Sequence, residues 1–263
     1  MLKPGIVSIT FRGTSPEEIL ERAAAAGLEG IEWGGDVHVP HGDLSAARRV
    51  GELTRGSDLS VVAYGSYYRF GEIFGREGPD FGAVLDSAEA LGAPVVRVWA
   101  GSKGSDGTDE NERRRLVEAA RRHGENAGAR GMVVAFEYHR NTLTDTNDSA
   151  ATLLEEIAHP NVRTLWQPPN GASLEYCLDG LRRVLPRLEH LHCFHWGASG
   201  SDDKRPLHEG KELWLSYLEE VAGATPHSQD RWVLLEFVPG GSWESLYRDA
   251  RTLRDWIRVT DSG

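Results

Sequence analysis

The segment MVVAFEYHRNTLTDTNDSAATLLEEIAHPNVRTLWQ (132–167) contains two apolar runs separated by a stretch with helical spacing. The runs MVVAFE (132–137) and VRTLWQ (162–167) are short and rich in β-branched and aromatic residues, which is typical of strands buried on both faces. Between them, SAATLLEEIAHP (149–160) predicts a helix. Two strands joined through a helix predict a parallel pair, and parallel sheets carry their chemistry at the carboxyl ends of the strands.

The same alternation of strand and helix extends over the whole chain and gives eight units. Strands are predicted at 5–11, 29–34, 60–68, 94–101, 132–139, 162–169, 188–196 and 231–239, and helices at 15–27, 43–57, 79–92, 109–131, 149–160, 174–185, 211–223 and 242–257. In the first helix, Ser15 is the expected N-cap, Pro16 lies in the first turn and Gly27 follows the last turn. We therefore predict an α/β protein with one (β/α)8 TIM barrel domain over residues 1–263. A doubly wound open sheet is the alternative, but no GxGxxG or GxxxxGK[ST] loop follows the first strand.

The composition is that of an ordinary globular protein, with 40% hydrophobic and 26% charged residues. No stretch approaches the roughly 18 apolar residues of a membrane span, and the start MLKPGIVSITF lacks the long apolar region of a signal peptide. Cys177 and Cys193 are too few for a disulfide framework, so we expect reduced thiols and a cytoplasmic location. The net charge of −11 disfavours nucleic acid or an anionic membrane as a partner.

Four residues that can bind a metal follow apolar runs at the ends of four predicted strands: Glu137, Gln167, His192 and Glu236. Because parallel strands end at one face of a barrel, these side chains are expected to converge on one metal site. A glutamate at a strand end is more often a solvated carboxylate or an ion-pair partner. Glu137 and Glu236, however, follow the strongly apolar runs VVAF and WVLL, and a charge held there is costly unless it is paired or metal-bound.

The segment HLHCFHW (190–196) carries three histidines in six residues. His190, His192 and Phe194 share one strand face, and one face only can point into the barrel. We expect His192 to be a metal ligand and His195 to lie in a loop beside the site. Gln167 offers an amide oxygen, which can bind a hard cation or hydrogen-bond a substrate but carries no charge.

Further polar and aromatic side chains follow the predicted strands and would line the mouth of the barrel. Any one of them alone is more often structural or solvated, but together they form a surface suited to a sugar, whose hydroxyls meet polar groups and whose C–H faces pack on aromatic rings. The predicted substrate-binding residues are Glu32, His38, Tyr64, Trp99, Lys103, His139, Arg140, Asn170, His195 and Arg205. No GxSxG, HExxH or CxxC motif supports nucleophilic hydrolysis or a zinc finger.

At these residues the chain resembles the xylose isomerase-like barrel superfamily, the sugar phosphate isomerases/epimerases. The resemblance covers nearly the whole chain and is carried by GLEGIEWGGDVHV (27–39), VVRVWAG (95–101), the glutamate of AFEYH, the HLH of the seventh strand and the glutamate of LLEF. It implies one divalent metal ion (Mn, Zn, Mg or Co) held by Glu, Asp, His and Glu, which here correspond to Glu137, Gln167, His192 and Glu236. The departure is Gln167, which removes a negative charge and should weaken metal binding.

The resemblance also implies a reaction: proton transfer beside a carbonyl, with Glu137 and Glu236 as the catalytic residues that remove and return the proton through an enediolate. The leading hypothesis is a metal-dependent isomerase or epimerase acting on a ketose or related polyol ketone, assembled as a homodimer or homotetramer as family members often are. One alternative is a lyase like the inosose dehydratases, and another is a degenerate, non-catalytic sugar-binding barrel. A phosphodiester hydrolase like endonuclease IV is opposed by the net charge of −11 and by the arrangement of the histidines.

Overall fold

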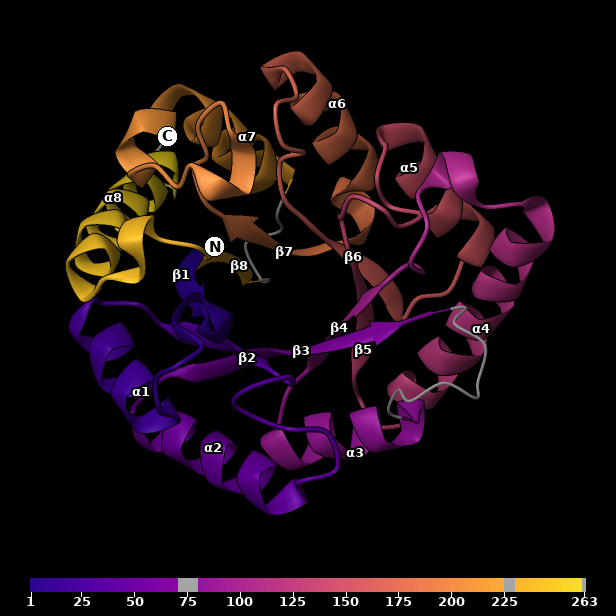
Figure 1. Ribbon diagram of the computed structural model, residues 1–263, viewed down its shortest axis with the longest axis horizontal. Coiled ribbons are helices and arrows are strands. Elements are labelled where there is room, and N and C mark those ends of the chain that lie inside the picture. Colours follow the sequence, from indigo (N-terminus) through magenta and orange to yellow (C-terminus); the bar gives the residue numbers. More distant parts are fainter. Residues whose placement is uncertain (71–79, 225–229, 262–263) are drawn as a thin grey trace.

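Eight parallel strands pair in chain order and close into a barrel in the part of the chain that the structure describes, because β1 pairs with both β2 and β8 (Figure 1). The computed structural model describes residues 1–70, 80–224 and 230–261. The strands are β1 (Leu2–Val7), β2 (Gly30–Gly34), β3 (Ser60–Arg69), β4 (Val95–Trp99), β5 (Val133–Glu137), β6 (Val162–Trp166), β7 (Leu188–Cys193) and β8 (Arg231–Leu235). The predicted (β/α)8 barrel is confirmed.

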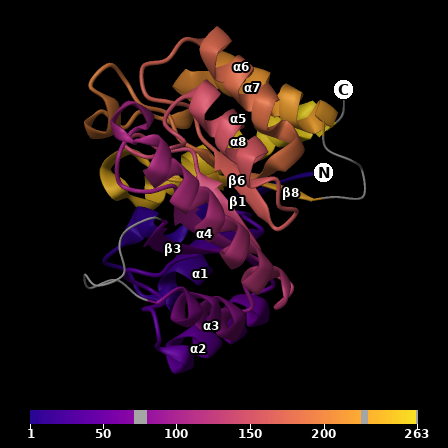
Figure 2. The ribbon, with the colours of Figure 1, turned by 90° about the vertical axis from the view of Figure 1, so that its right-hand side faces the viewer.

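One helix follows each strand, and together the helices form a ring around the barrel (Figure 1). The helices are α1 (Pro16–Ala25), α2 (Leu44–Gly56), α3 (Phe81–Leu91), α4 (Glu110–Gly128), α5 (Asn147–Ile157), α6 (Leu174–Val184), α7 (Lys211–Ala224) and α8 (Trp243–Asp261). Seen from the side, the N-terminus lies at one end of the barrel and the long connection from β7 to α7 extends from the other (Figure 2). No helix within these described ranges is both long and apolar enough to cross a membrane.

The local signals of the first helix are confirmed, but the first strand differs from its prediction. Ser15 caps α1 by accepting a hydrogen bond from the backbone N–H of Glu18 at 3.3 Å. The strand predicted at 5–11 occupies Leu2–Val7 instead, and Ser8–Phe11 forms a 3-10 turn. The reason is that the Ser8 hydroxyl accepts the N–H of Gly34 at 2.9 Å, which draws the chain out of the sheet at this point.

The second and third strands end within one residue of their predicted ends, whereas β4 to β8 end earlier than the apolar patterns predict. Residues 167–169, 194–196 and 236–239 all follow the last strand residue, so the polar groups there lie in the loops of the barrel mouth. The helix predicted at 79–92 is found at 81–91, and Pro79 lies outside the described residues.

Side chains along each strand alternate between the inside of the barrel and the helices. On β4 and β5, Val96 and Phe136 belong to the larger hydrophobic cluster, which lies between the sheet and the helices. Their neighbours Val95 and Ala135 belong to a smaller cluster inside the barrel. Because the side-chain period of a strand is two, the residues at 97, 99 and 137 must also point inward. This alternation fixes which polar residues meet at the barrel axis.

A histidine of α4 that packs among aromatic side chains should make folding stability depend on pH. His123 packs on Phe81 with ring centroids 4.1 Å apart, and burial lowers the pKa of His123 to about 4. The unfolded chain would protonate this ring near its ordinary pKa of 6.5, so the contribution to stability is complete above pH 6.5 and is lost as pH falls toward 4. Between pH 7 and 5 we expect a loss of about 1–2 kcal/mol, discounted for the partial exposure of the ring.

The measurement is urea unfolding at both pH values of the wild type, of His123→Gln and of a control, His208→Gln, whose histidine is exposed. The pH-dependent loss should shrink in His123→Gln and persist in the control. An equal loss in all three proteins would contradict the assignment.

Candidate active site

A connected group of polar side chains fills the barrel interior near the carboxyl ends of the strands. Its members come from four strands and from the residues that directly follow two others, β6 and β8, and none is more than 9% exposed. We call this group the polar network. It consists of Glu32, Arg97, Glu137, Gln167, His190, His192 and Glu236, so the structure brings all four predicted metal ligands into one network.

On one side of the network, the carboxylate of Glu137 is held by three donors. Arg97 donates from Nη1 and Trp99 donates from Nε1, the latter at 2.5 Å, both to Oε2 of Glu137. Gln167 donates from Nε2 to Oε1 at 3.2 Å. The guanidinium of Arg97 also lies 2.7 Å from Oε1 of Glu32, measured from Nε, so it joins two buried carboxylates from β2 and β5.

On the other side, both histidines of β7 contact the same oxygen of Glu32. Nε2 of His190 lies 3.1 Å and Nε2 of His192 lies 3.0 Å from Oε2 of Glu32. A carboxylate oxygen can only accept, so each imidazole carries a proton on Nε2. Nδ1 of His192 lies 3.5 Å from a carboxylate oxygen of Glu236. The strand face that carries His190 and His192 therefore points into the barrel.

Burial opposes the charges on Glu32, Arg97, Glu137 and His192, and the opposite charges beside them outweigh it. Burial alone would raise the pKa of Glu137, but Arg97 and His192 hold it below its ordinary value. Burial would also raise the pKa of Glu32, yet His192 and Arg97 keep it well below its usual range. The pKa of His192 is raised to about 10, because Glu32 and Glu236 overcome the effect of burial. The network is therefore an ionised one.

The donor atoms in the network suit a metal ion in two overlapping ways. Glu32, His190 and His192 offer ligand atoms that all lie within 4.8 Å of one another and could hold a metal. In addition, the buried atoms of the network that have no hydrogen-bond partner within the described ranges include Oε1 of Gln167 and Nδ1 of His192. Both belong to residues of the predicted metal set. With Glu32 holding the proton on Nε2 of His192, the lone pair of the neutral ring would lie on Nδ1, which faces Glu236.

The charge of the network also fits a divalent cation. In the metal-free protein His192 is protonated, because its pKa is raised to about 10. A metal on Nδ1 would displace that proton, and with three charged carboxylates, a protonated Arg97 and neutral imidazoles the network would then carry two net negative charges. One divalent ion would neutralise it. The amide of Gln167 leaves the site one negative charge short of a site with a carboxylate at position 167, and Arg97 adds a positive charge. The affinity of the site for a divalent metal ion should therefore be lower.

Close packing and unusual backbone surround the network. A Cβ at Gly65 would lie 2.6 Å from Nη2 of Arg97 and 2.8 Å from Oε1 of Glu32, so only glycine leaves room for this ion pair. Tyr67 and Phe237 adopt the left-handed backbone conformation, with φ of 56° and 58°. Such a conformation is strained for a bulky residue. The Tyr67 ring lies 4.5 Å from the Arg97 guanidinium, and Phe237 directly follows Glu236.

A cavity of about 650 Å³ opens beside the polar network and reaches Gln167; we call it the reaction pocket. Other residues that line it include Tyr138, His139, Arg140, Asp145, Asn170, Phe194, Trp196, Lys204 and Phe237. His139 is half-buried, and its ring lies over that of Trp99 with centroids 5.0 Å apart. Nδ1 of His139 donates to the backbone carbonyl of Arg140 at 2.7 Å, so in the neutral ring the lone pair lies on Nε2.

The predicted substrate-binding residues divide into two groups. His139, Arg140 and Asn170 line the reaction pocket, Trp99 lies between His139 and Glu137, Glu32 lies within the polar network, and His195 lines a neighbouring cavity. Four others do not line the reaction pocket and are bonded elsewhere. The Tyr64 hydroxyl donates to the carbonyl of Val39, His38 bonds to Ser8, Lys103 pairs with Glu112 and Arg205 pairs with Asp203.

The sequence prediction missed Arg97, Lys204 and the aromatic walls formed by Phe194, Trp196 and Phe237. A signal for Arg97 exists: it is the single charged residue in the apolar run VVRVW of a strand buried on both faces. A charge in that position requires buried partners of the opposite sign. Lys204 carries no such signal, because it follows a long loop whose path the sequence does not determine.

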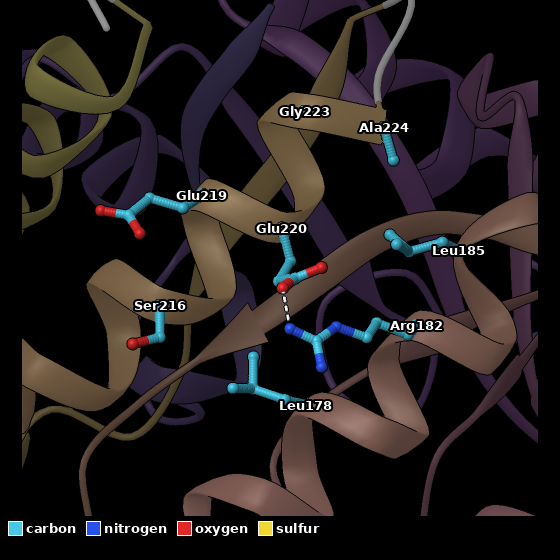
Figure 3. A pocket seen from close by; sticks show the side chains of 8 residues that line it. All are labelled: Leu178, Arg182, Leu185, Ser216, Glu219, Glu220, Gly223 and Ala224. Carbon is cyan, nitrogen blue, oxygen red and sulfur yellow. Dashed lines mark hydrogen bonds and ion pairs between the residues drawn. The ribbon is translucent and has the colours of Figure 1, made fainter.

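A separate groove of about 540 Å³ lies on the outside of the barrel between α6 and α7 (Figure 3). Its lining residues include Leu178, Arg182, Glu220 and Ala224, and Arg182 pairs with Glu220 across it. Most of these residues lie in the second halves of the two helices, which lead away from the carboxyl ends of the strands. The groove therefore does not belong to the candidate active site.

Comparisons with known proteins agree with this architecture. A family model described as a xylose isomerase-like TIM barrel matches residues 20–258. The chain is 27% identical over 210 residues to a 3-dehydroshikimate dehydratase from Bacillus anthracis, covering 73% of this chain and 71% of that protein.

Two solved structures share the fold over nearly their whole length. The crystal structure of a probable 3-DHS dehydratase from Bacillus anthracis superimposes with a TM-score of 0.77 and 22% identity, covering 97% of this chain and 99% of that chain. The IOLI protein with a bound zinc atom gives a TM-score of 0.77 and 16% identity, covering 99% of this chain and 100% of that chain.

Proposed function

Because the chain belongs to the xylose isomerase-like TIM barrel family, we propose that it is a metal-dependent lyase that dehydrates a small polyhydroxylated ring ketone. The relative that is 27% identical is a 3-dehydroshikimate dehydratase, which supports this class of reaction. The observation that carries the proposal is the contrast between His139, a pocket histidine with a lone pair on Nε2, and Glu137, a carboxylate fixed by Arg97 and Trp99.

In this reaction His139 acts as the base. Its Nε2 removes the proton from the carbon beside the carbonyl, and the C–H electrons form the new C=C bond. The C–O bond at the next carbon breaks, and the hydroxyl leaves as water with the proton that His139 returns. The hydrogen bond to the carbonyl of Arg140 and the contact with Trp99 hold the ring in the tautomer and orientation that this transfer needs.

The metal would be held by Glu137, Gln167, His192 and Glu236, with Glu32 fixing the tautomer of His192. When bound, a divalent ion polarises the substrate carbonyl and so acidifies the adjacent C–H. The wall of the reaction pocket offers the donors Arg140, Asn170 and Lys204 and the acceptors Asp145 and Asp202. A polyhydroxylated substrate matches this mixture, because each hydroxyl both donates and accepts.

An isomerase or epimerase is the second candidate, because Glu137 and Glu236 come from strands on opposite walls of the barrel. That reaction needs two carboxylates that exchange a proton with carbon. The lowered pKa of Glu137, caused by Arg97 and His192 against the effect of burial, makes it a weak base. A single histidine base is sufficient for dehydration, so the geometry supports the lyase better.

The deciding experiment incubates the Mn²⁺-loaded protein in D₂O with 3-dehydroshikimate, an inosose and a panel of ketoses, followed by NMR and mass spectrometry. Loss of one water with new alkene or aromatic signals supports the lyase. Deuterium incorporation beside the carbonyl without loss of water would favour the isomerase or epimerase. If neither change is seen in the wild type, and Gln167→Asp binds the metal more tightly but also shows neither, the result favours the hypothesis of a non-catalytic sugar-binding barrel.

The metal set has its own prediction. After incubation with Mn²⁺ and dialysis, elemental analysis of the wild type should give about one metal ion per chain, and Glu137→Gln/Glu236→Gln should give none, because both charged ligands are lost. A control with two exposed carboxylates replaced, Glu219→Gln/Glu244→Gln, should retain the metal. Equal metal content in both double variants would place the ion elsewhere, and the cluster of Glu32, His190 and His192 would be tested next.

A further inference from the structure

A second cavity of about 420 Å³ adjoins the reaction pocket. It lies between the loops that follow β6 and β7 and the start of α7, where Leu213, Trp214 and Tyr217 form part of its wall. The two cavities share the lining residues Pro168, Pro169, Asn170, Phe194 and Trp196. The two cavities therefore lie next to each other around these five residues.

The common wall is aromatic and flat. Phe194 and Trp196 are stacked with ring centroids 4.1 Å apart and an interplanar angle of 19°. Phe237 lies on the side of the reaction pocket, 6.0 Å from Trp196. On the far side of the second cavity, Leu213 is an exposed large hydrophobic side chain, with 37% of its surface accessible. Parallel aromatic faces with apolar surroundings bind flat rings and the C–H faces of sugars.

The second cavity also contains polar groups that can orient a ligand. Nε1 of Trp196 is buried and has no acceptor within the described residues. A buried donor of this kind favours a ligand oxygen as its partner. Asn170 and His195 line the same cavity, and burial lowers the pKa of His195, which keeps its ring neutral at pH 7. The lining thus combines apolar faces with a few neutral hydrogen-bonding groups, as ligand sites do.

We propose that the second cavity is a subsite for a second ring, either a sugar or an aryl group, attached to the ring that reacts. Binding pockets for whole small ligands measure about 300–1,000 Å³, so each of the two cavities is large enough for one ring. The inference rests on the proposed function only because it assigns the reacting ring to the reaction pocket. If the inference is correct, the substrate consists of two linked rings and not of a single small ring.

Equilibrium binding tests this without requiring turnover. Methyl β-glucoside, phenyl β-glucoside and the disaccharide cellobiose would be titrated calorimetrically into the Mn²⁺-loaded protein. At least one two-ring probe should bind about tenfold or more tightly than methyl β-glucoside, and the phenyl and disaccharide arms distinguish an aryl from a sugar subsite. Equal affinities for all three probes, or no measurable binding of either two-ring probe, would overturn the inference.

A substitution that fills the second cavity tests whether the second ring binds there. Ala198 is exposed and lines the second cavity but not the reaction pocket, so Ala198→Trp should reduce the preference for the two-ring probe at least fivefold. The matched control is Ala224→Trp, which adds the same side chain at the outer groove (Figure 3) and should leave the preference unchanged. A preference that survives Ala198→Trp would show that the second ring binds elsewhere. If the protein turns over single-ring ketones but does not bind two-ring probes more tightly, only the subsite proposal is refuted. If it binds two-ring probes more tightly but turns over no ketone, only the lyase proposal is refuted.

Discussion

Replacing His139 with alanine is expected to lower kcat by about 10²–10⁴-fold, the range that a positioned general base contributes. The metal content should stay unchanged, because His139 lies outside the polar network and donates from Nδ1 to a backbone carbonyl. The measurement is kcat on the substrate identified by the NMR screen, together with elemental analysis of the same preparation. The loss should be partly reversed by added imidazole, which a merely structural role would not permit.

The neighbouring residue supplies the control. Arg140 also lines the reaction pocket, and Arg140→Ala should raise KM more than it lowers kcat, because its guanidinium would bind substrate without exchanging protons. If His139→Ala retained more than a tenth of the wild-type kcat, the base would have to be another group. Glu236 would then be the next residue to test, and the isomerase or epimerase mechanism would gain support.

Replacing Arg97 with methionine is expected to lower the free energy of unfolding by about 3–5 kcal/mol, the usual effect of breaking a buried ion pair by removing one partner. Arg97 is 2% exposed and pairs with both Glu32 and Glu137, so its loss removes a buried positive charge from two buried carboxylates. Denaturant unfolding of the metal-free protein at pH 7 measures the change. This would remove a large fraction of the 5–15 kcal/mol by which domains are typically stable.

Two further variants separate charge from packing. Arg163→Met breaks the ion pair with Glu189 on the neighbouring strand, but there the arginine side chain is 33% exposed, so the loss should stay below about 1 kcal/mol. Adding Glu137→Gln to Arg97→Met should recover part of the lost stability, because one unpaired charge disappears. A similar loss for Arg97→Met and Arg163→Met would mean that the buried pairs contribute no more than a surface pair.

The fold is largely predictable from the sequence because eight apolar runs alternate with helical stretches over a length typical of a parallel barrel, and no nucleotide-binding loop supports the doubly wound alternative. The errors are at strand ends. An apolar run such as Ser8–Phe11 looks like the continuation of a strand, but the hydrogen bond between Ser8 and Gly34 comes from tertiary contact. Local pattern carries no information on that contact.

The sequence predicts part of the candidate site, but it does not predict the contacts between its residues. The strand-end rule finds Glu137, Gln167, His192 and Glu236, and the structure joins them into one network. It does not reveal that Arg97 pairs with Glu137, because that bond depends on which inward residue of β4 stands at the same height as the end of β5. Height in a closed barrel is set by the stagger of all the strands together.

The strained backbone at Tyr67 and Phe237 means that substitutions which raise thermal stability would also remove aromatic side chains from the candidate active site. A library of variants selected for heat resistance alone would enrich glycine or asparagine at both positions, since these residues adopt a positive φ with little strain. Such variants would lose the Tyr67 ring, which lies against Arg97, and the Phe237 ring, which lines the reaction pocket. Directed evolution of this protein should therefore hold both positions fixed, because the most thermostable variants would lose two aromatic side chains at the candidate active site.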